Sequence, residues 1–124
     1  MEDNSDRLQK TILVAEDVES NFLLLKALLG KTYTMLHALN GQEAIDLFQS
    51  EKPDLILMDV KMPFMDGLEA TRQIRQLSLT IPIIALTAFA FDQDRIRTLA
   101  AGCNDFLTKP LVPKILKEMI EKYI

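Results

Sequence analysis

The 124-residue chain contains one cysteine, only four glycines and no long apolar run. Because Cys103 has no second thiol to pair with, an internal disulfide is excluded, a cysteine-based zinc site is disfavoured and a small buried thiol is expected. No stretch approaches the roughly 20 apolar residues that a membrane-spanning helix needs. A Gly-rich phosphate-binding loop is also absent, which argues against direct nucleotide binding.

A targeting segment is missing too. Residues 1–10 are polar and charged, so we expect a flexible N-terminal linker or tail there, and a cytoplasmic location. Residues 11–124 are expected to form one domain, since 48% hydrophobic and 26% charged content is typical of an ordinary globular protein. No membrane partner is expected for this segment.

Positive charge is not in excess: 14 Lys and Arg residues stand against 18 Asp and Glu residues, a formal net charge of −4. Nucleic-acid binding requires clustered Lys and Arg, so we expect no nucleic-acid partner for this domain. Clustered carboxylates at one place would instead favour a divalent metal ion.

Apolar runs and helical patterns alternate along the whole chain. The predicted strands are residues 11–15, 33–39, 54–59, 81–87 and 106–108. The predicted helices are residues 20–29, 40–52, 67–77, 92–101 and 113 onward, where apolar residues recur at helical spacing. Five such strand–helix pairs predict a parallel sheet with helices on both faces.

Single residues mark several boundaries of these elements. Asn40 and Glu43 predict a capped helix start of the capping-box type. Asp66 is interpreted as the start of the helix that follows it, rather than as a metal ligand. Pro82 is tolerable as the second residue of its strand. His37, alone on a predicted strand, is interpreted as a structural or surface residue and not as a phosphodonor.

Polar residues follow four of the predicted strands at the point where each ends. They are Glu16, Asp17, Asp59, Thr87 and Lys109. Because the carboxyl ends of parallel strands lie on one edge of the sheet, we expect these side chains to converge. Three crowded carboxylates favour Mg²⁺, Lys109 supplies a movable positive charge, and Thr87 supplies a hydroxyl donor. Together they are the parts needed for phosphoryl transfer to an aspartate.

Around these residues the sequence resembles the receiver (CheY-like) domains of bacterial two-component response regulators and hybrid histidine kinases. The resemblance extends over residues 11–124. Two segments, Met58-Asp59-Val-Lys-Met-Pro63-Phe-Met-Asp66-Gly67 and Ala101-Gly102-Cys-Asn-Asp-Phe106-Leu-Thr-Lys109-Pro110, are most similar to receivers of hybrid sensor kinases. The resemblance implies an α/β fold, a flavodoxin-like three-layer (βα)5 sandwich whose five-stranded parallel sheet has the order 2-1-3-4-5.

The resemblance also implies a function, that of phosphoacceptor domain in a two-component phosphorelay. Asp59 would accept a phosphoryl group from a histidine of a histidine kinase or of a histidine phosphotransfer protein. Mg²⁺ would be held by Glu16, Asp17, Asp59 and the backbone carbonyl of Lys61. The chain would catalyse only its own phosphorylation and dephosphorylation, so it is not expected to be an enzyme in the ordinary sense.

Thr87 and Lys109 match the family's other catalytic residues, and Pro110 would follow Lys109 in a cis peptide. Phosphorylation would draw Thr87 inward and let Phe106 turn into the vacated space. The surface formed by residues 92–101, 106–108 and the last helix would then change, for a downstream domain or for self-association. Phe106 lacks the hydroxyl of the usual switching aromatic, so burial alone would have to stabilise its inward rotamer.

Three positions are expected to tune this chemistry. Glu16 stands where the family more often has Asp, which keeps the charge and adds one methylene. Lys61, two residues after the acceptor, and Phe89, two residues after Thr87, match positions that modulate loss of phosphate to water. We expect the bulky Phe89 to screen the acyl phosphate and slow its hydrolysis.

Two other functions remain open. A phosphohydrolase with an aspartyl nucleophile typically has a second Asp two residues after the first, and position 61 is Lys. A degenerate receiver that only binds proteins is disfavoured, because all five chemical positions are filled. The sequence also leaves open whether the chain is a free-standing regulator or a fragment of a hybrid kinase.

Overall fold

The structure is a computed structural model, and it describes residues 9–88 and 92–124. The five strands are β1 (Thr11–Ala15), β2 (Thr34–Ala38), β3 (Leu55–Asp59), β4 (Ile83–Thr87) and β5 (Asp105–Thr108). The helices are α2 (Glu19–Leu29), α3 (Gly41–Glu51), α4 (Gly67–Leu77), α5 (Asp92–Ala101) and α6 (Pro113–Tyr123). None of the described helices is both long and apolar enough to cross a membrane.

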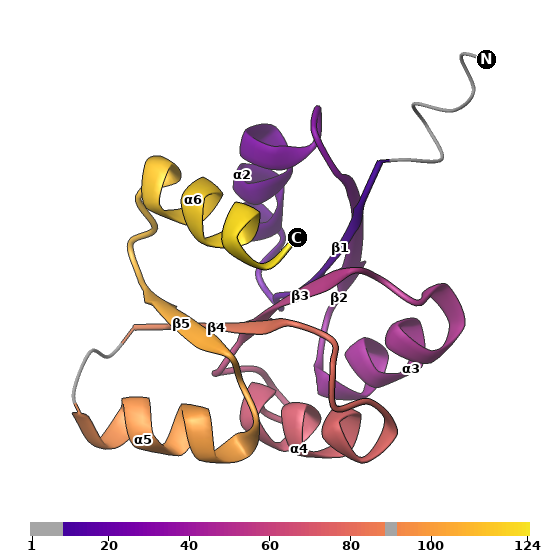
Figure 1. The fold of residues 1–124 in the computed structure, drawn as a ribbon, viewed down its shortest axis with the longest axis vertical. Coiled ribbons are helices and arrows are strands. Elements are labelled where there is room, and N and C mark those ends of the chain that lie inside the picture. The colour runs from indigo at the N-terminus through magenta and orange to yellow at the C-terminus, as the bar shows by residue number, and fades with distance from the viewer. Residues whose placement is uncertain (1–8, 89–91) are drawn as a thin grey trace.

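All neighbouring strands pair in parallel, in the order β2-β1-β3-β4-β5. Figure 1 shows α2 and α6 on one face of this sheet and α3, α4 and α5 on the other. The chain therefore forms the three-layer (βα)5 sandwich, and the predicted fold class and strand order are confirmed.

The core consists of two layers, one under each set of helices, because successive strand residues point to opposite faces. Leu55 and Leu57 pack with side chains of α2 and α6, whereas Ile56 and Met58 pack with those of α3 and α4. Every residue of β3 and β4 is buried, as expected for central strands of a sheet that is covered on both faces. Cys103 is a buried free thiol, as predicted.

The predicted helix starts are confirmed by their hydrogen bonds. The side chain of Asn40 accepts from the backbone N–H of Glu43 at 2.9 Å, and Asp66 accepts from Glu69 N–H at 2.9 Å. The carboxylate of Glu43 accepts from Leu39 N–H, one residue before the cap, so the capping box is a variant of the usual one.

Strand ends differ from the predicted ones by one or two residues. β4 begins at Ile83 rather than at residue 81, since Pro82 has no N–H to donate and contributes only its carbonyl, which accepts from Ile56 N–H at 2.9 Å. β2 is one residue shorter at each end than predicted, and β5 begins one residue earlier, at Asp105.

Candidate functional site

The strand register brings the predicted residues to one edge of the sheet. Asp59 is the last residue of β3 and pairs with Leu86, next to Thr87 at the end of β4. The preceding residue, Met58, pairs with Ala15, the last residue of β1, so Glu16 lies beside Asp59. The backbone N–H of Lys109 donates to the carbonyl of Thr87 at 2.7 Å.

Asp59 is 4% exposed, and both of its carboxylate oxygens have partners. Oδ2 accepts a hydrogen bond from Lys109 Nζ at 3.0 Å. Oδ1 accepts from the backbone N–H of Lys61 at 3.1 Å. A buried carboxylate is costly without such partners, so the ammonium and the amide explain how an acid can end a buried strand.

Glu16 is 1% exposed and lies on the other side of the same ammonium, with Oε1 3.5 Å from Lys109 Nζ. Its Oε2 accepts from Val18 N–H at 3.2 Å and from the Asn21 amide at 3.4 Å. Burial, followed by the charge of Asp59, raises the pKa of Glu16 above its ordinary value. This acid is therefore held in a site that disfavours its own negative charge.

Lys109 is the counter-charge to both buried acids. Burial by itself would lower the pKa of Lys109, but the hydrogen bond and charge of Asp59, with a further contribution from Glu16, raise it overall. The lysine therefore carries its charge throughout the neutral range. The peptide bond between Lys109 and Pro110 is cis, as the family resemblance implied.

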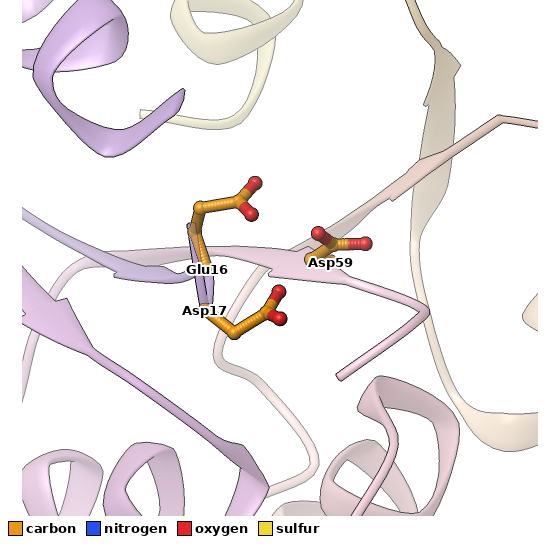
Figure 2. A group of neighbouring side chains, drawn as sticks. All are labelled: Glu16, Asp17 and Asp59. Carbon is orange, nitrogen blue, oxygen red and sulfur yellow. The ribbon is translucent and has the colours of Figure 1, made fainter. Parts of the chain in front are cut away.

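Figure 2 shows the carboxylates of Glu16, Asp17 and Asp59 gathered at the strand ends. One oxygen of each lies within 4.8 Å of the others. Asp17 is exposed, while the other two acids are buried. Hard carboxylate oxygens at this spacing fit an Mg²⁺ ion that keeps part of its water shell. The three carboxylates of the expected donor set are therefore compatible with magnesium.

A cleft of about 610 Å³ opens over these carboxylates and is lined by Lys61, Thr87 and Lys109 as well. Thr87, one of these lining residues, is 5% exposed. Phe106 does not line this cleft; it is half-buried against the core layer beneath α5, with the guanidinium carbon of Arg95 5.6 Å from its ring centroid. Phe89, the other predicted tuning residue, lies outside the described residues.

The loop after Asp59 is fitted closely to the start of α4. A Cβ built on Gly67 would lie only 2.1 Å from the carbonyl oxygen of Asp59, so no larger residue fits without a shift of the backbone. The N–H of Gly67 donates to Val60 at 2.9 Å and closes this loop. Gly67 therefore allows α4 to begin in close contact with the backbone of Asp59.

Sequence reasoning missed several residues of the site. Asp94 and Arg97 on α5 line the cleft, and their charged groups lie 3.6 Å apart. Their spacing of three residues on a helix could have suggested this ion pair, but not its place at the cleft. His37 was assigned no role at the site, yet its Nε2 lies 2.7 Å from the backbone oxygen of Glu16. No local pattern signals such a contact between a side chain and the backbone of a neighbouring strand.

Comparison with known proteins relates this geometry to a family. Residues 12–121 match the response regulator receiver domain. Over 130 residues the chain is 40% identical to hybrid signal transduction histidine kinase I of Dictyostelium discoideum, covering 97% of this chain and 8% of the kinase. The chain thus spans a small part of the length of that relative.

Two solved structures carry the same fold. The receiver domain of sensor histidine kinase PA1611 from Pseudomonas aeruginosa, with magnesium coordinated in its active site cleft, has a TM-score of 0.86 and 36% identity, covering 93% of this chain and 97% of that one. The receiver domain of Ssk1 from Saccharomyces cerevisiae, crystallised with the histidine phosphotransfer protein Ypd1, has a TM-score of 0.88 and 32% identity, covering 93% and 88%.

The matched residues include every candidate site residue from Glu16 to Lys109 and nearly the whole sheet. The strand order, the convergent carboxylates and the lysine after β5 agree with this match. The chain therefore belongs to the response regulator receiver domain family, the signalling phosphoacceptors of two-component phosphorelays.

Proposed function

We propose that the cleft is a Mg²⁺-dependent phosphoacceptor site, in which Asp59 takes a phosphoryl group from a histidine of a partner protein. The observation that carries this proposal is the pair of contacts to Asp59, from Lys109 Nζ at 3.0 Å and from Lys61 N–H at 3.1 Å, beside two further carboxylates. These contacts pair both carboxylate oxygens of Asp59 and fix the orientation of the carboxylate at the cleft.

During transfer, a bond forms between phosphorus and a carboxylate oxygen of Asp59 while the bond between phosphorus and the histidine nitrogen breaks. The electron pair of the broken bond stays on the nitrogen. Lys109 follows the developing charge from the carboxylate to a phosphoryl oxygen, and the Thr87 hydroxyl donates to another. Positioning and charge neutralisation supply most of the acceleration in this class of reaction.

The metal would be held by Glu16, Asp17, Asp59 and the backbone carbonyl of Lys61. When bound, Mg²⁺ supplies neutralisation of the clustered carboxylates and an attachment point for a phosphoryl oxygen. Magnesium in the cleft of the PA1611 receiver supports this assignment. We expect dephosphorylation to use the same residues, with Lys61 and Phe89 setting how fast water reaches the acyl phosphate.

The donor is proposed to be a histidine kinase or a histidine phosphotransfer protein in the cytoplasm. Apolar side chains around the strand ends favour a protein surface over a small molecule: Val18 is 45%, Phe64 98% and Val112 52% exposed. Each follows a strand that ends at the acidic edge, and Val18 lines the cleft. The complex of the Ssk1 receiver with Ypd1 supports a donor of this kind.

The output is proposed to be a population shift in which phosphorylation moves Thr87 and Phe106 and alters the surface of α5, β5 and α6. That surface would meet a downstream domain or a second copy of the chain. Phe106, on β5 next to β4, is only half-buried against the core layer under α5, so its ring can become more buried when the end of β4 is drawn inward.

The test is acceptor chemistry with a small phosphodonor. Wild-type protein is incubated with phosphoramidate and Mg²⁺, and the intact mass is measured. We expect the gain of one phosphoryl group, its loss in Asp59→Asn and on chelation of the metal, and its retention in Asp46→Asn, an exposed acid on α3.

Beryllofluoride separates the alternatives. Saturable Mg²⁺-dependent binding that disappears in Asp59→Asn supports the phosphoacceptor. Steady turnover of small phosphate esters would instead indicate a phosphohydrolase, and absence of any beryllofluoride binding in the wild type would indicate a protein-binding module.

A further inference from the structure

The turn between β1 and α2 carries two of the three clustered carboxylates, so its backbone position sets the geometry of the proposed metal site. The backbone of its first residue, Glu16, is tied to the edge strand β2 through both its N–H and its carbonyl. Glu16 N–H donates to the carbonyl of Ala38 at 2.9 Å, and His37 Nε2 lies 2.7 Å from the carbonyl oxygen of Glu16. Because a carbonyl only accepts, His37 must carry its proton on Nε2.

The orientation of the His37 imidazole ring is also fixed, by an aromatic contact. Its ring stacks on that of Phe22 with 3.9 Å between the centroids and 2° between the planes. Phe22 is 8% exposed and belongs to the core layer under α2 and α6. The histidine is therefore fixed at two points, by the core through its face and by the acidic turn through Nε2.

The carbonyl of Glu16 belongs to the peptide that leads directly into Asp17. Rotation about the Cα–C bond of Glu16 would turn this carbonyl and swing the Cα of Asp17, and hence the one exposed carboxylate of the cluster, relative to the buried pair Glu16 and Asp59. A hydrogen bond that fixes the carbonyl direction therefore fixes where the Asp17 carboxylate points. Residues behind metal ligands commonly act in this way, by orienting the groups that do the binding.

We infer that His37 is a positioning residue for the proposed metal site, acting through its Nε2–H bond to the Glu16 carbonyl rather than by touching metal or phosphate. This inference deepens the proposed function and rests on it, because it presupposes that the acidic turn binds Mg²⁺. The competing explanation is that His37 only supports the first turns of α2 through its stack on Phe22. The two explanations separate because the hydrogen bond and the stack can be removed independently.

Two substitutions make that separation. His37→Phe keeps an aromatic ring to stack on Phe22 but loses the donor. His37→Gln keeps a side-chain N–H of similar reach but loses the ring. Thr34→Val, on the same strand but at its other end, is the matched control, since the Thr34 hydroxyl contacts Gln9 and no residue of the cleft.

Magnesium affinity, measured by titration calorimetry, and thermal stability without metal are recorded for all four proteins. In His37→Phe we expect affinity to fall about tenfold with little loss of stability, the lower end of what loss of a ligand's supporting partner costs. His37→Gln should lose stability yet keep most of the affinity, and Thr34→Val should change neither. Unchanged affinity in His37→Phe, or affinity that follows stability across both variants, would overturn the inference.

The wild type offers a second measurement. His37 is the only histidine of the chain, so its ring nitrogens give a unique NMR signal. We expect a protonated Nε2 coupled across the hydrogen bond to the Glu16 carbonyl, and an unprotonated Nε2 would overturn the inference even if the variants failed to fold. If the wild type itself bound no Mg²⁺, the proposed function would fail first, which distinguishes the two outcomes.

Discussion

Glu16 is almost completely buried next to a second buried carboxylate. Burial and the charge of Asp59 raise the pKa of Glu16, and the hydrogen bonds from Val18 and Asn21 and the charge of Lys109 do not fully offset them. Without a metal ion, the ionised form of Glu16 therefore opposes folding at neutral pH. Such a group is retained for its chemistry and not for stability.

Replacing this acid should stabilise the metal-free protein. Glu16→Gln keeps an oxygen that can accept from Val18 N–H but removes the charge, so we expect the free energy of unfolding at pH 7 to rise by about 1 kcal/mol, an ordinary size for a single substitution. Urea unfolding in the presence of a chelator measures this. Magnesium affinity should fall in the same variant, and a less stable Glu16→Gln protein would contradict the prediction.

The stability gained by Glu16→Gln should depend on pH, because the pKa of Glu16 is raised in the folded protein. Because the folded-state pKa of Glu16 lies above its ordinary value of 4.5, protonation removes its unfavourable charge as the pH falls through the folded pKa. The advantage of Glu16→Gln over the wild type should therefore shrink from pH 7 toward pH 4.5. Unfolding curves of both proteins across this range test it, and a difference that stays constant with pH would point to packing instead.

Phe106 gains from Arg95 a partner that the sequence did not suggest. The guanidinium carbon lies 5.6 Å from the ring centroid, so the ring is held by a cation–π contact as well as by burial. In a double-mutant cycle with Arg95→Met and Phe106→Leu, we expect a coupling free energy of about 0.5–1 kcal/mol. Coupling indistinguishable from zero would mean that the contact does not contribute to the position of Phe106.

At the scale of elements, α3 and α4 begin in the same way, but only the capping residue of α4 lines the cleft. Asn40 caps α3 and Asp66 caps α4, each accepting one backbone N–H at 2.9 Å. Substitution of either cap by Ala should cost about 1 kcal/mol of stability. Only Asp66→Ala should also weaken Mg²⁺ binding, because α4 begins against the carbonyl of Asp59 through Gly67.

Asn40→Ala is thus the matched control for Asp66→Ala, equal in mechanism but at a residue that does not line the cleft. Urea unfolding and Mg²⁺ titration of both variants give the comparison. An equal loss of affinity in the two proteins would show that general destabilisation, and not the position of α4, controls the metal site.

The elements were predictable because their signals are local. Helix α4 was predicted with its observed bounds, since Asp66 and Gly67 mark its start and an amphipathic pattern continues to Leu77. Strand ends were less exact where the decisive partner was distant. β4 starts after Pro82, which has no N–H to donate and contributes only its carbonyl to β3, a one-sided pairing that the isolated segment does not reveal.

The candidate site was likewise predictable only in part. Glu16, Asp17, Asp59, Thr87 and Lys109 could be placed together from strand order alone, because parallel strands end on one edge. The contact from His37 to the Glu16 carbonyl and the cation over Phe106 depend on side-chain directions across different elements. Sequence periodicity indicates which face a residue lies on, but not which atom it reaches.

At the scale of the whole molecule, the site exists only when the sheet has formed. The carboxylates come from the ends of β1 and β3, and Lys109 follows β5, 50 residues after Asp59 in the sequence. The unfolded chain cannot hold these groups at the spacing seen here, with carboxylate oxygens within 4.8 Å of one another. Any ion that binds the three acids together therefore binds the folded state and stabilises all of it.

Magnesium should accordingly raise the free energy of unfolding in proportion to the logarithm of its concentration once the site is nearly saturated. At a free concentration 100 times the dissociation constant, the gain should be about 2.7 kcal/mol. Urea unfolding at a series of Mg²⁺ concentrations measures it, with NaCl at matched ionic strength as the control for screening. Asp59→Asn should reduce the Mg²⁺ effect, because it removes one of the three ligands from the cluster, while leaving the NaCl effect unchanged. If NaCl stabilised the wild type as much as Mg²⁺ does, the carboxylates would be responding to bulk ionic strength, and a specific metal site at this edge of the sheet would be contradicted.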